Sequence, residues 1–468
     1  MSKDINGETY SQKILMEIVL SGAFVALLAE TFLNNGLTTI MKSLQVSQAT
    51  AQWLSTAYQL VMGLMIPLSA WVFNNFKTKD SYKGMLAIFT FGSFVCFIAP
   101  NFAILLVGRI IEAIAAGALM PFIQNIVLAL FPPEKRGLGL GITGLVIAFA
   151  PATGPSIAGL LLKFFNWRIL FLVLSVLSGI VFLISFSYSR TLNKVHRSKL
   201  DFLSLLWSTI GFGGLLYAFS AIGNSGRIDL VETITFIVGI IFIALFCIRQ
   251  NHLTKPVVSM KVFKNGIFNL STILSTLSNF AMLGIELIIP LYLQNVRGLS
   301  ALDTGLILIP GAVLTGIFNP VAGVIFDKIG ARKVSVIGFV LLTLGTVPML
   351  TFGTETNIIW IMSLYALRLV GITFITMNDF TAGINALNPR LKAHGNAASS
   401  TVRQIGSSLG TALSITMVTL GMNFNHNLGK MSSLVVGYHW AFMMMTIVAI
   451  IGLVLSFWLP KKVQKATK

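Results

Sequence analysis

The chain has 468 residues, of which 55% are hydrophobic and only 10% are charged, and its mean hydropathy is +0.85. A water-soluble protein of this length carries far more charge, so the composition excludes that class and indicates many membrane-spanning helices. The net charge of +18 does not indicate nucleic-acid binding, because the Lys and Arg residues are spread through short gaps between apolar segments.

Fourteen apolar segments follow one another along the chain, and each is close to or above the roughly 20 residues that cross a bilayer. Of the 33 Lys and Arg residues, 24 lie in the tails and gaps on one side of this topology, 6 on the other side and 3 inside segments. This bias predicts cytoplasmic termini. The predicted segments are 17–40, 51–72, 84–102, 103–130, 137–162, 168–187, 202–222, 232–249, 267–296, 301–326, 334–353, 357–387, 397–420 and 437–459.

The remaining composition indicates no covalent or metal chemistry. The first twelve residues lack the basic region of a signal peptide, so we expect no cleavage. Cys96 and Cys247 both fall inside predicted segments and are expected to stay reduced. The five His residues show no ligand spacing, and neither a nucleophile constellation nor a Walker A motif occurs. We therefore expect no catalytic residues, no metal site and no cofactor.

The sequence repeats weakly at an offset of about 256 residues. The loop "FNNFKTK" after the second segment has a counterpart in "FDKIGARK" after the tenth, which places Asn74 opposite Asp327. Arg109 in the fourth segment and Arg368 in the twelfth are offset in the same way. The repeat predicts two six-helix bundles with extra helices between them. The predicted parts are residues 1–190 (first bundle), 191–262 (two basic loops and two additional helices) and 263–468 (second bundle and basic tail).

Acidic residues occur at equivalent points of this repeat, Glu30 in the first segment and Glu286 in the ninth. An unpaired carboxylate inside a bilayer costs about 3 kcal/mol even on the lenient insertion scale, so the two indicate a functional site between the halves. Glu112 and Arg368 are expected at the same depth as these acids, roughly 15 Å from the external ends of their helices, and Arg109 one turn shallower on the helix face of Glu112. Three acids and two arginines are neutral when one carboxyl is protonated, which is the charge balance of a one-proton carrier.

A polar stripe is expected to continue from Glu30 through Asn34 and Thr38 on the same helix face. These faces are predicted to line a water-filled cavity between the bundles and not to face lipid. On the second segment, the side chains expected to share this cavity are Gln52, Thr56 and Gln59.

Two pairings stay open at this point. Arg109 could form a static buried ion pair with Glu30 or with Glu112, and Glu112 could equally be a proton site. Asp379 and Arg403 are expected at similar depths near the cytoplasmic ends of neighbouring helices, so we interpret them as a structural pair.

Several motifs are similar to those of the fourteen-span drug:proton antiporters of the major facilitator superfamily, the group with EmrB-like, QacA-like and lincomycin-resistance-type exporters. "AETFLNNGLTTI" resembles their first-helix motif, and "LLVGRIIEAIAAGALMP" their fourth-helix motif with Arg109 as its basic residue. "GLVIAFAPATGPSIAGLL" resembles the antiporter signature of the fifth helix, and "GVIFDKIGARK" the cytoplasmic loop motif. The resemblance covers essentially the whole chain.

By this resemblance, we expect an all-α transporter of the superfamily fold in the bacterial cytoplasmic membrane. It would act as a monomer and export lipophilic, cationic drugs in exchange for protons, driven by the proton gradient without ATP. The alternatives are a proton-coupled exporter of one metabolite, amino acid or lipid, and, less favoured, a channel or receptor. The residues that the resemblance assigns to the gating motif are Gly323, Asp327, Gly330, Arg332 and Lys333, and those of the antiporter motif are Gly144, Pro151, Gly154, Pro155 and Gly159.

Departures from the family pattern concern the first bundle. Ala70, Asn74 and Lys77 replace the glycines and the acid of its loop motif, so gating is expected to depend mainly on the second copy. Glu112 stands where the family commonly has Gln.

Overall fold

The structure is a computed structural model of the chain. It describes residues 2–460 except 4–8, 47, 194, 196–200, 226–228, 254, 255, 300, 426 and 428. Within helices it leaves undescribed the side chains of residues 34, 35, 38, 48, 49, 52, 56, 134, 148, 151, 152, 155, 156, 220, 222–225, 301 and 302.

Fourteen long α-helices make up nearly all of the described chain. They are α1 (Gln12–Leu44), α2 (Gln48–Asn75), α3 (Thr78–Ile98), α4 (Phe102–Leu130), α5 (Arg136–Phe164), α6 (Arg168–Tyr188), α7 (Phe202–Ser225), α8 (Leu230–His252), α9 (Gly266–Asn295), α10 (Ala301–Ile329), α11 (Ala331–Thr346), α12 (Ile358–Asn385), α13 (Lys392–Phe424) and α14 (Lys430–Ser456). The short elements are strands β1 (Ser2–Lys3) and β2 (Thr9–Tyr10) and 3₁₀ turns at Pro133–Lys135, Met260–Lys264, Val347–Thr351 and Pro389–Leu391.

Long apolar runs become helices because, without water, every backbone amide must find its partner inside its own segment. Several helices begin at a capping asparagine: the side chain of Asn101 accepts from the Ile104 amide, and that of Asn265 from the Phe268 amide. Thirteen helices are long and apolar enough to cross a membrane, and α5 contributes a shorter apolar described stretch, Arg136–Ile147. The predicted all-α membrane fold is confirmed.

Most helices extend past the predicted segments at one or both ends. α1 begins at Gln12 and not at residue 17, α13 at Lys392 and not at 397, and α14 at Lys430 and not at 437. Hydropathy detects only the part of a helix that suits the bilayer core, whereas the helical hydrogen bonds continue into its polar ends.

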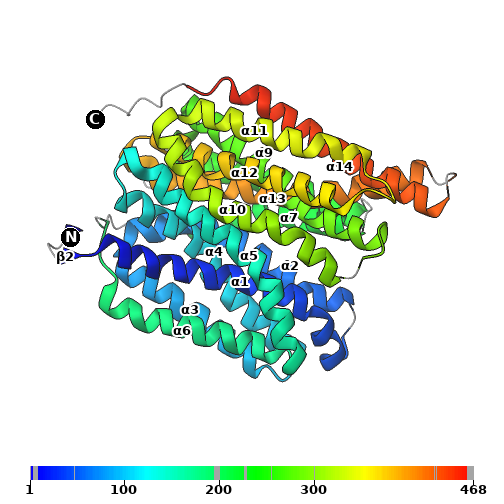
Figure 1. Ribbon diagram of the computed structural model, residues 1–468. Helices are drawn as coiled ribbons and strands as arrows, with labels where there is room; N and C mark the ends of the chain where they lie inside the picture. The colour runs from blue at the N-terminus through cyan, green and yellow to red at the C-terminus, as the bar shows by residue number, and fades with distance from the viewer. Residues whose placement is uncertain are drawn as a thin grey trace.

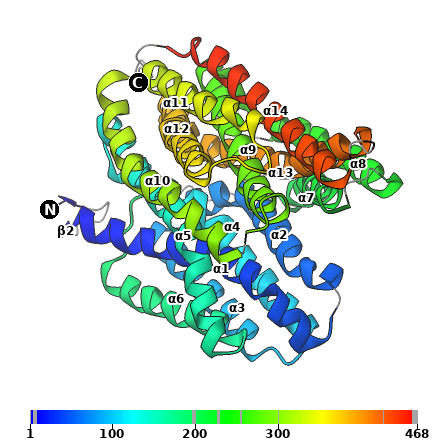
Figure 2. The ribbon, with the colours of Figure 1, turned by 45° about the vertical axis from the view of Figure 1, so that its right-hand side comes forward.

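Figures 1 and 2 show two groups of helices side by side, α1–α6 (the first half) and α9–α14 (the second half). The halves meet along two seams, where α5 packs on α10 and α2 packs on α13. α7 and α8, which we call the inserted hairpin, lie at the second seam, with α7 against both α2 and α13. The N-terminal end of α1 and the C-terminal end of α14 lie at the same end of the bundle, which we call the termini end (Figure 1).

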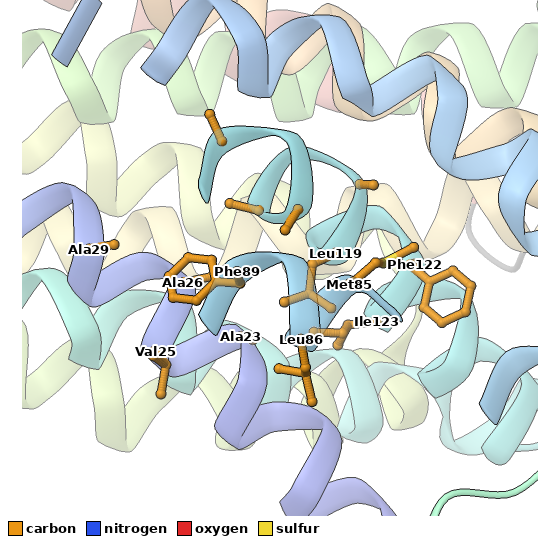
Figure 3. Close-up of a cluster of buried hydrophobic side chains, with 14 of the residues drawn as sticks. Ala23, Val25, Ala26, Ala29, Met85, Leu86, Phe89, Leu119, Phe122 and Ile123 are labelled. Atoms are coloured by element: carbon orange, nitrogen blue, oxygen red, sulfur yellow. The ribbon is translucent and has the colours of Figure 1, made fainter. Parts of the chain in front are cut away.

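The core of the first half is built from small residues on α1 facing large ones on α3 and α4 (Figure 3). Ala23, Ala26 and Ala29 recur along one face of α1 and are nearly or completely buried. Phe89 of α3 and Phe122 of α4 are buried in the same cluster, where the Phe122 ring packs on Phe73 of α2 with ring centroids 5.6 Å apart. This alternation of small and large side chains gives the close packing on which membrane helices depend.

Glycines bring α3 and α4 into backbone contact. A Cβ atom on Gly92 would lie 2.6 Å from the Glu112 amide nitrogen, and one on Gly108 would lie 2.5 Å from Cys96 Sγ. The second half repeats this arrangement, because a Cβ on Gly345 of α11 would lie 2.8 Å from the Arg368 amide nitrogen of α12. In both halves a glycine therefore sets the position of the helix that carries the buried arginine.

We predict that Gly92→Ala destabilises the protein by about 1–3 kcal/mol, because α3 and α4 must separate to admit the methyl group. The measurement is thermal unfolding of the purified protein in detergent. Gly84→Ala on the same helix is the matched control, since nothing lies within 4 Å of a Cβ there. Equal melting temperatures for the two variants would contradict this account of the α3–α4 contact.

Candidate functional site

The first half contains a fully buried ion pair. Arg109 Nη1 lies 2.6 Å from Glu112 Oε2, both side chains are 0% exposed, and the two residues are one turn apart on α4. Ser93 of α3 donates a hydrogen bond to the other carboxylate oxygen of Glu112 at 2.5 Å. Of the two ion pairs left open by the sequence, Arg109 with Glu112 is therefore the one that forms.

Arg109 also holds two neighbouring helices. Its guanidinium carbon lies 3.9 Å from the ring centroid of Tyr58 on α2, and Nη1 donates to the Ala29 carbonyl of α1 at 3.3 Å. Its Nε and Nη2 atoms are buried without a hydrogen-bond partner in the described chain. The Arg109 side chain thus ties α1, α2 and α4 together immediately below Glu30.

Arg368 repeats this role in the second half. It is fully buried, its Nε donates to Thr346 Oγ1 of α11 at 3.2 Å, and its Nη2 donates to the Ala281 carbonyl of α9. Arg109 binds a carbonyl of α1 and Arg368 one of α9, so the sequence repeat extends to this hydrogen bond. Arg368 Nη1 has no partner among the described atoms.

Glu30 is partly exposed and bonded to an amide, not to an arginine. Gln59 Nε2 of α2 donates to Glu30 Oε1 at 2.9 Å. No cation lies within ion-pair distance of Glu30 in the described part of the structure. The side chain therefore faces α2 and the space between the halves, where an unpaired carboxylate can meet water or a cationic ligand.

Glu286 of α9 is the counterpart of Glu30 in the second half. It too is partly exposed, and the described residues form no hydrogen bond with it. Two charged groups act on its carboxylate: Arg368 from its own half and Glu30 from the first half. The negative charge of Glu30 in the first half thus acts on Glu286 in the second, as the predicted central site between the halves requires.

The other predicted cavity residues are placed only in part. Gln59 of α2 is exposed and donates a hydrogen bond to Glu30 of α1, as expected of two side chains that share one cavity. The side chains of Asn34, Thr38, Gln52 and Thr56 lie outside the described part, so their lining role stays a prediction.

Asp327 connects the halves at the termini end. Its two carboxylate oxygens each accept a backbone hydrogen bond at 3.1 Å, one from Gly137 and one from Leu138, which begin α5 in the other half. A carboxylate on the first amides of a helix satisfies free donors and complements the helix dipole. Gly323, one turn before Asp327, touches the Gly137 backbone, so no larger residue fits there.

The remaining residues of this loop motif form the turn between α10 and α11. Gly330 has φ +84°, a left-handed conformation that glycine adopts without strain. Lys333 is exposed and Arg332 half-buried at the start of α11.

Further polar contacts close the termini end. Asn396 of α13 donates to the Pro121 carbonyl at 2.6 Å and to Asn125 Oδ1 at 2.8 Å, both on α4. Arg136 donates to Asn385 Oδ1 of α12 at 2.7 Å. Side chains from both halves therefore hold this end shut in the structure.

The fifth-helix motif lies in an uninterrupted helix that contacts both halves. Gly144 of α5 faces Asn319 of α10, where a Cβ would lie 2.7 Å from Asn319 Oδ1. Gly154 faces Thr31 of α1 and leaves no room for a side chain, whereas Gly159 faces open space. The side chains of Pro151 and Pro155 lie outside the described part.

The predicted pair of Asp379 and Arg403 is wrong. Asp379 is buried and accepts a hydrogen bond from Ser335 of α11 at 2.9 Å. Arg403 instead lies over the Phe380 ring at 4.6 Å and donates to Ser400 on its own helix. Similar depth does not establish a pair, because the two side chains leave their helices in different directions.

Several residues of the site were not apparent from the sequence. Ser93 and Thr346 bind the buried charges, and Tyr58 stacks on Arg109. Ser and Thr are common in membrane helices, so their presence alone does not indicate a functional role. The only available signal was that they lie on helices next to those that carry Arg109 and Arg368.

Comparison with known proteins agrees with this geometry. Residues 19–411 match the Major Facilitator Superfamily. The chain is 39% identical over 461 residues to an uncharacterized MFS-type transporter, YcnB, of Bacillus subtilis, with 98% of each chain covered. It is 34% identical over 455 residues to the lincomycin resistance protein LmrB of Listeria monocytogenes, with 96% of each chain covered.

A solved structure supports the fold independently. The human organic anion transporter MFSD10 superposes with a TM-score of 0.68 over 96% of this chain and 100% of its own, at 12% identity. Taken with the family match over most of its length, the chain is a multi-pass membrane transporter that belongs to the Major Facilitator Superfamily.

Proposed function

We propose that the protein exports lipophilic cationic drugs across the bacterial cytoplasmic membrane in exchange for protons. The observation that carries this proposal is a pair of partly exposed acids, Glu30 and Glu286, from opposite halves, whose charges act on each other and which form no direct ion pair among the described residues. Such a site attracts a cation and lies where both halves can change its access.

The charge count of the site supports exchange. Arg109 and Glu112 neutralise each other in their buried pair, which leaves Glu30, Glu286 and Arg368. Two negative charges and one positive charge sum to −1, so either one proton or one monovalent cation makes the centre neutral. Proton and drug then compete for the same charge, which couples their movements in opposite directions.

A transport cycle follows from this competition. A cationic drug enters from the cytoplasm or inner leaflet and binds between the deprotonated acids. The halves then rock, and the site opens to the outside with the termini end closed by Asp327 and Asn396. External protons neutralise the acids, weaken the attraction for the drug and allow the return. The membrane potential contributes about 2.3 kcal/mol per charge per 100 mV.

The name of one relative supports the drug class: the LmrB protein of Listeria monocytogenes is a lincomycin resistance protein. Lincomycin is therefore a suitable first compound to test beside a lipophilic dye cation.

The alternative is a proton-coupled exporter of one metabolite, amino acid or lipid on the same fold. A narrow exporter would bind one compound tightly and be inhibited by few others, whereas a multidrug exporter would be inhibited by many unrelated cations.

We predict that Glu30→Gln and Glu286→Gln each reduce gradient-driven export about tenfold or more, because the neutral site no longer exchanges its charge. The assay is uptake of a fluorescent lipophilic cation into proteoliposomes with an imposed pH gradient, with substrate exchange at equal pH measured in parallel. Glu17→Gln, an exposed acid on the same helix as Glu30, is the control and should transport normally. Unchanged pH-driven transport in both site variants would refute the proton-coupling role.

The structure favours a positioning role for Glu112. We predict that Glu112→Gln lowers stability by about 3–5 kcal/mol, because Arg109 is left buried without its counter-ion. Thermal unfolding in detergent gives the comparison, with the double variant Arg109→Met with Glu112→Met expected to be more stable than Glu112→Gln alone. If Glu112→Gln instead melts normally and loses only proton coupling, Glu112 is itself a proton site.

We predict that Asp327→Asn opens the termini end about tenfold more often. The amide has one acceptor oxygen, so it keeps at most one of the two backbone hydrogen bonds and loses the charge that complements the dipole of α5, together worth about 1–2 kcal/mol. A cysteine at buried Asn319, in a background with Cys96 and Cys247 replaced by Ser, should then react faster with a soluble maleimide. Asp303→Asn, at the other end of α10, is the control. Equal labelling rates in the two variants would show that Asp327 does not hold this end closed.

A further inference from the structure

The two seams between the halves are built differently. α5 and α10 pack directly, with the Gly137 backbone against Gly323 and Gly141 against Asn319. Along the other seam, α7 of the inserted hairpin packs against both α2 and α13 (Figure 2). If the halves rock, α7 cannot keep both sets of contacts, so it must move with one half and slide on the other.

The contacts of α7 with α13 form an apolar core. Leu215 and Phe219 of α7 and Ala412 of α13 are a buried cluster, and Ile405 and Leu409 of α13 pack on it. Such interdigitated contacts between helices favour a single relative position.

Hydrogen bonds also connect the C-terminal end of α8, which is one end of the inserted hairpin, to the second half. Gln250 of α8 accepts from the Val258 amide at 3.2 Å, and the next carbonyl back, that of Val257, lies 3.1 Å from His394 Nδ1 on α13. Val257 and Val258 are both nearly fully buried. The segment that follows α8 therefore attaches the hairpin to α13 by hydrogen bonds as well as by packing.

The two helices of the hairpin form one rigid unit. Arg249 donates two hydrogen bonds to Asp201, at 2.6 and 2.9 Å, and Gln250 donates to Ser204 at 2.6 Å. The bond from Arg249 lowers the pKa of Asp201 to about 2, so the pair stays charged at physiological pH. Higher up, Gly214 and Gly239 let the two backbones touch.

The contacts of α7 with α2 are of another kind. The Leu216 side chain lies over Gly63, where a Cβ would be 2.5 Å from it, and Gly213 faces Leu64. Trp53 stacks on Tyr217 with ring centroids 6.1 Å apart. Trp53 is exposed, and these contacts include no residue of the buried cluster that joins α7 to α13, so they oppose a shift of α7 along α2 less strongly than that cluster opposes one along α13.

The chain before α7 is anchored to the first half. Asn193 Oδ1 accepts from the amide and the hydroxyl of Thr78, at 2.9 and 2.7 Å, and its Nδ2 donates to the Phe76 carbonyl at 2.8 Å. Residues 194–200 then lead to Asp201 at the base of the hairpin. The last described anchor of this chain to the first half, Asn193, is thus separated by seven residues from the Asp201–Arg249 pair of the hairpin.

We propose that the inserted hairpin moves as part of the second half and slides over α2, which keeps the seam between α2 and α13 closed to lipid while the halves rock. This proposal rests on alternating access from the proposed function, but on neither the substrate nor the proton. It gives the two additional helices a mechanical role at one side of the transporter.

Disulfide cross-linking in a Cys96→Ser, Cys247→Ser background tests the proposal. One variant joins α7 to α13 through Leu215→Cys with Ala412→Cys, and the other joins α7 to α2 through Leu216→Cys with Gly63→Cys. Uptake of a fluorescent lipophilic cation is compared between the oxidised and reduced forms of each. We expect the first cross-link to leave transport within about twofold, and the second to reduce it about tenfold and reversibly.

The reverse pattern, two harmless cross-links or two inhibitory ones would each overturn the proposal. If both reduced forms fail to transport the dye, that result bears on the proposed function, and spin-label distances in the detergent-solubilised protein decide the role of the hairpin. Labels on α7 and α13 should give one narrow distribution, whereas labels on α7 and the external half of α2 should give a broad or split one. A narrow α7–α2 distance with a split α7–α13 distance would show that the hairpin belongs to the first half.

Discussion

The ion pair between Arg109 and Glu112 determines what the rest of the centre can do. A single unpaired charge in this fully buried position would carry a large desolvation free energy. Arg109 and Glu112 neutralise each other within one turn of α4, so together they add nothing to the net charge of the centre. The Ser93 hydroxyl and the Tyr58 ring complete the environment, so the pair is held rigidly. Because Arg109 is committed to Glu112, Glu30 is left without a cation of its own half and can respond to what enters the space between the halves.

The second half contains a related arrangement with one difference. Arg368 occupies the place of Arg109 and binds a carbonyl of α9, but the residue that follows it by three positions is Gly371 and not an acid. A Cβ on Gly371 would lie 2.6 Å from the Leu342 amide nitrogen, so this position serves backbone packing. The positive charge of Arg368 is therefore not taken up by an acid one turn along its own helix, and it acts on Glu286 instead.

The sequence predicted the all-α membrane fold, and the residues it assigned to a central site stay a prediction; it did not determine how the buried charges pair. Helices follow from hydropathy, and the depth of Glu30, Glu112 and Glu286 follows from counting residues along them. Depth leaves the direction of a side chain around its helix undetermined. The pairing of Arg109 with Glu112 could be considered from the sequence, because residues three positions apart on one helix lie next to each other. Asp379 and Arg403 lie on different helices, and their side chains do not meet.

The asymmetry of the loop motifs accompanies the inserted hairpin. In the second half, Asp327 caps α5 across the seam where the halves pack directly. In the first half the corresponding residue is Asn74, and the start of α3 is bonded instead by Asn193, from the chain that leads to α7. An acid that caps a helix of the other half would tie the halves together at this seam too. Because Asn74 stands in place of that acid, α2 lacks a carboxylate that could cap a helix of the second half. α2 is also the helix along which α7 would have to slide.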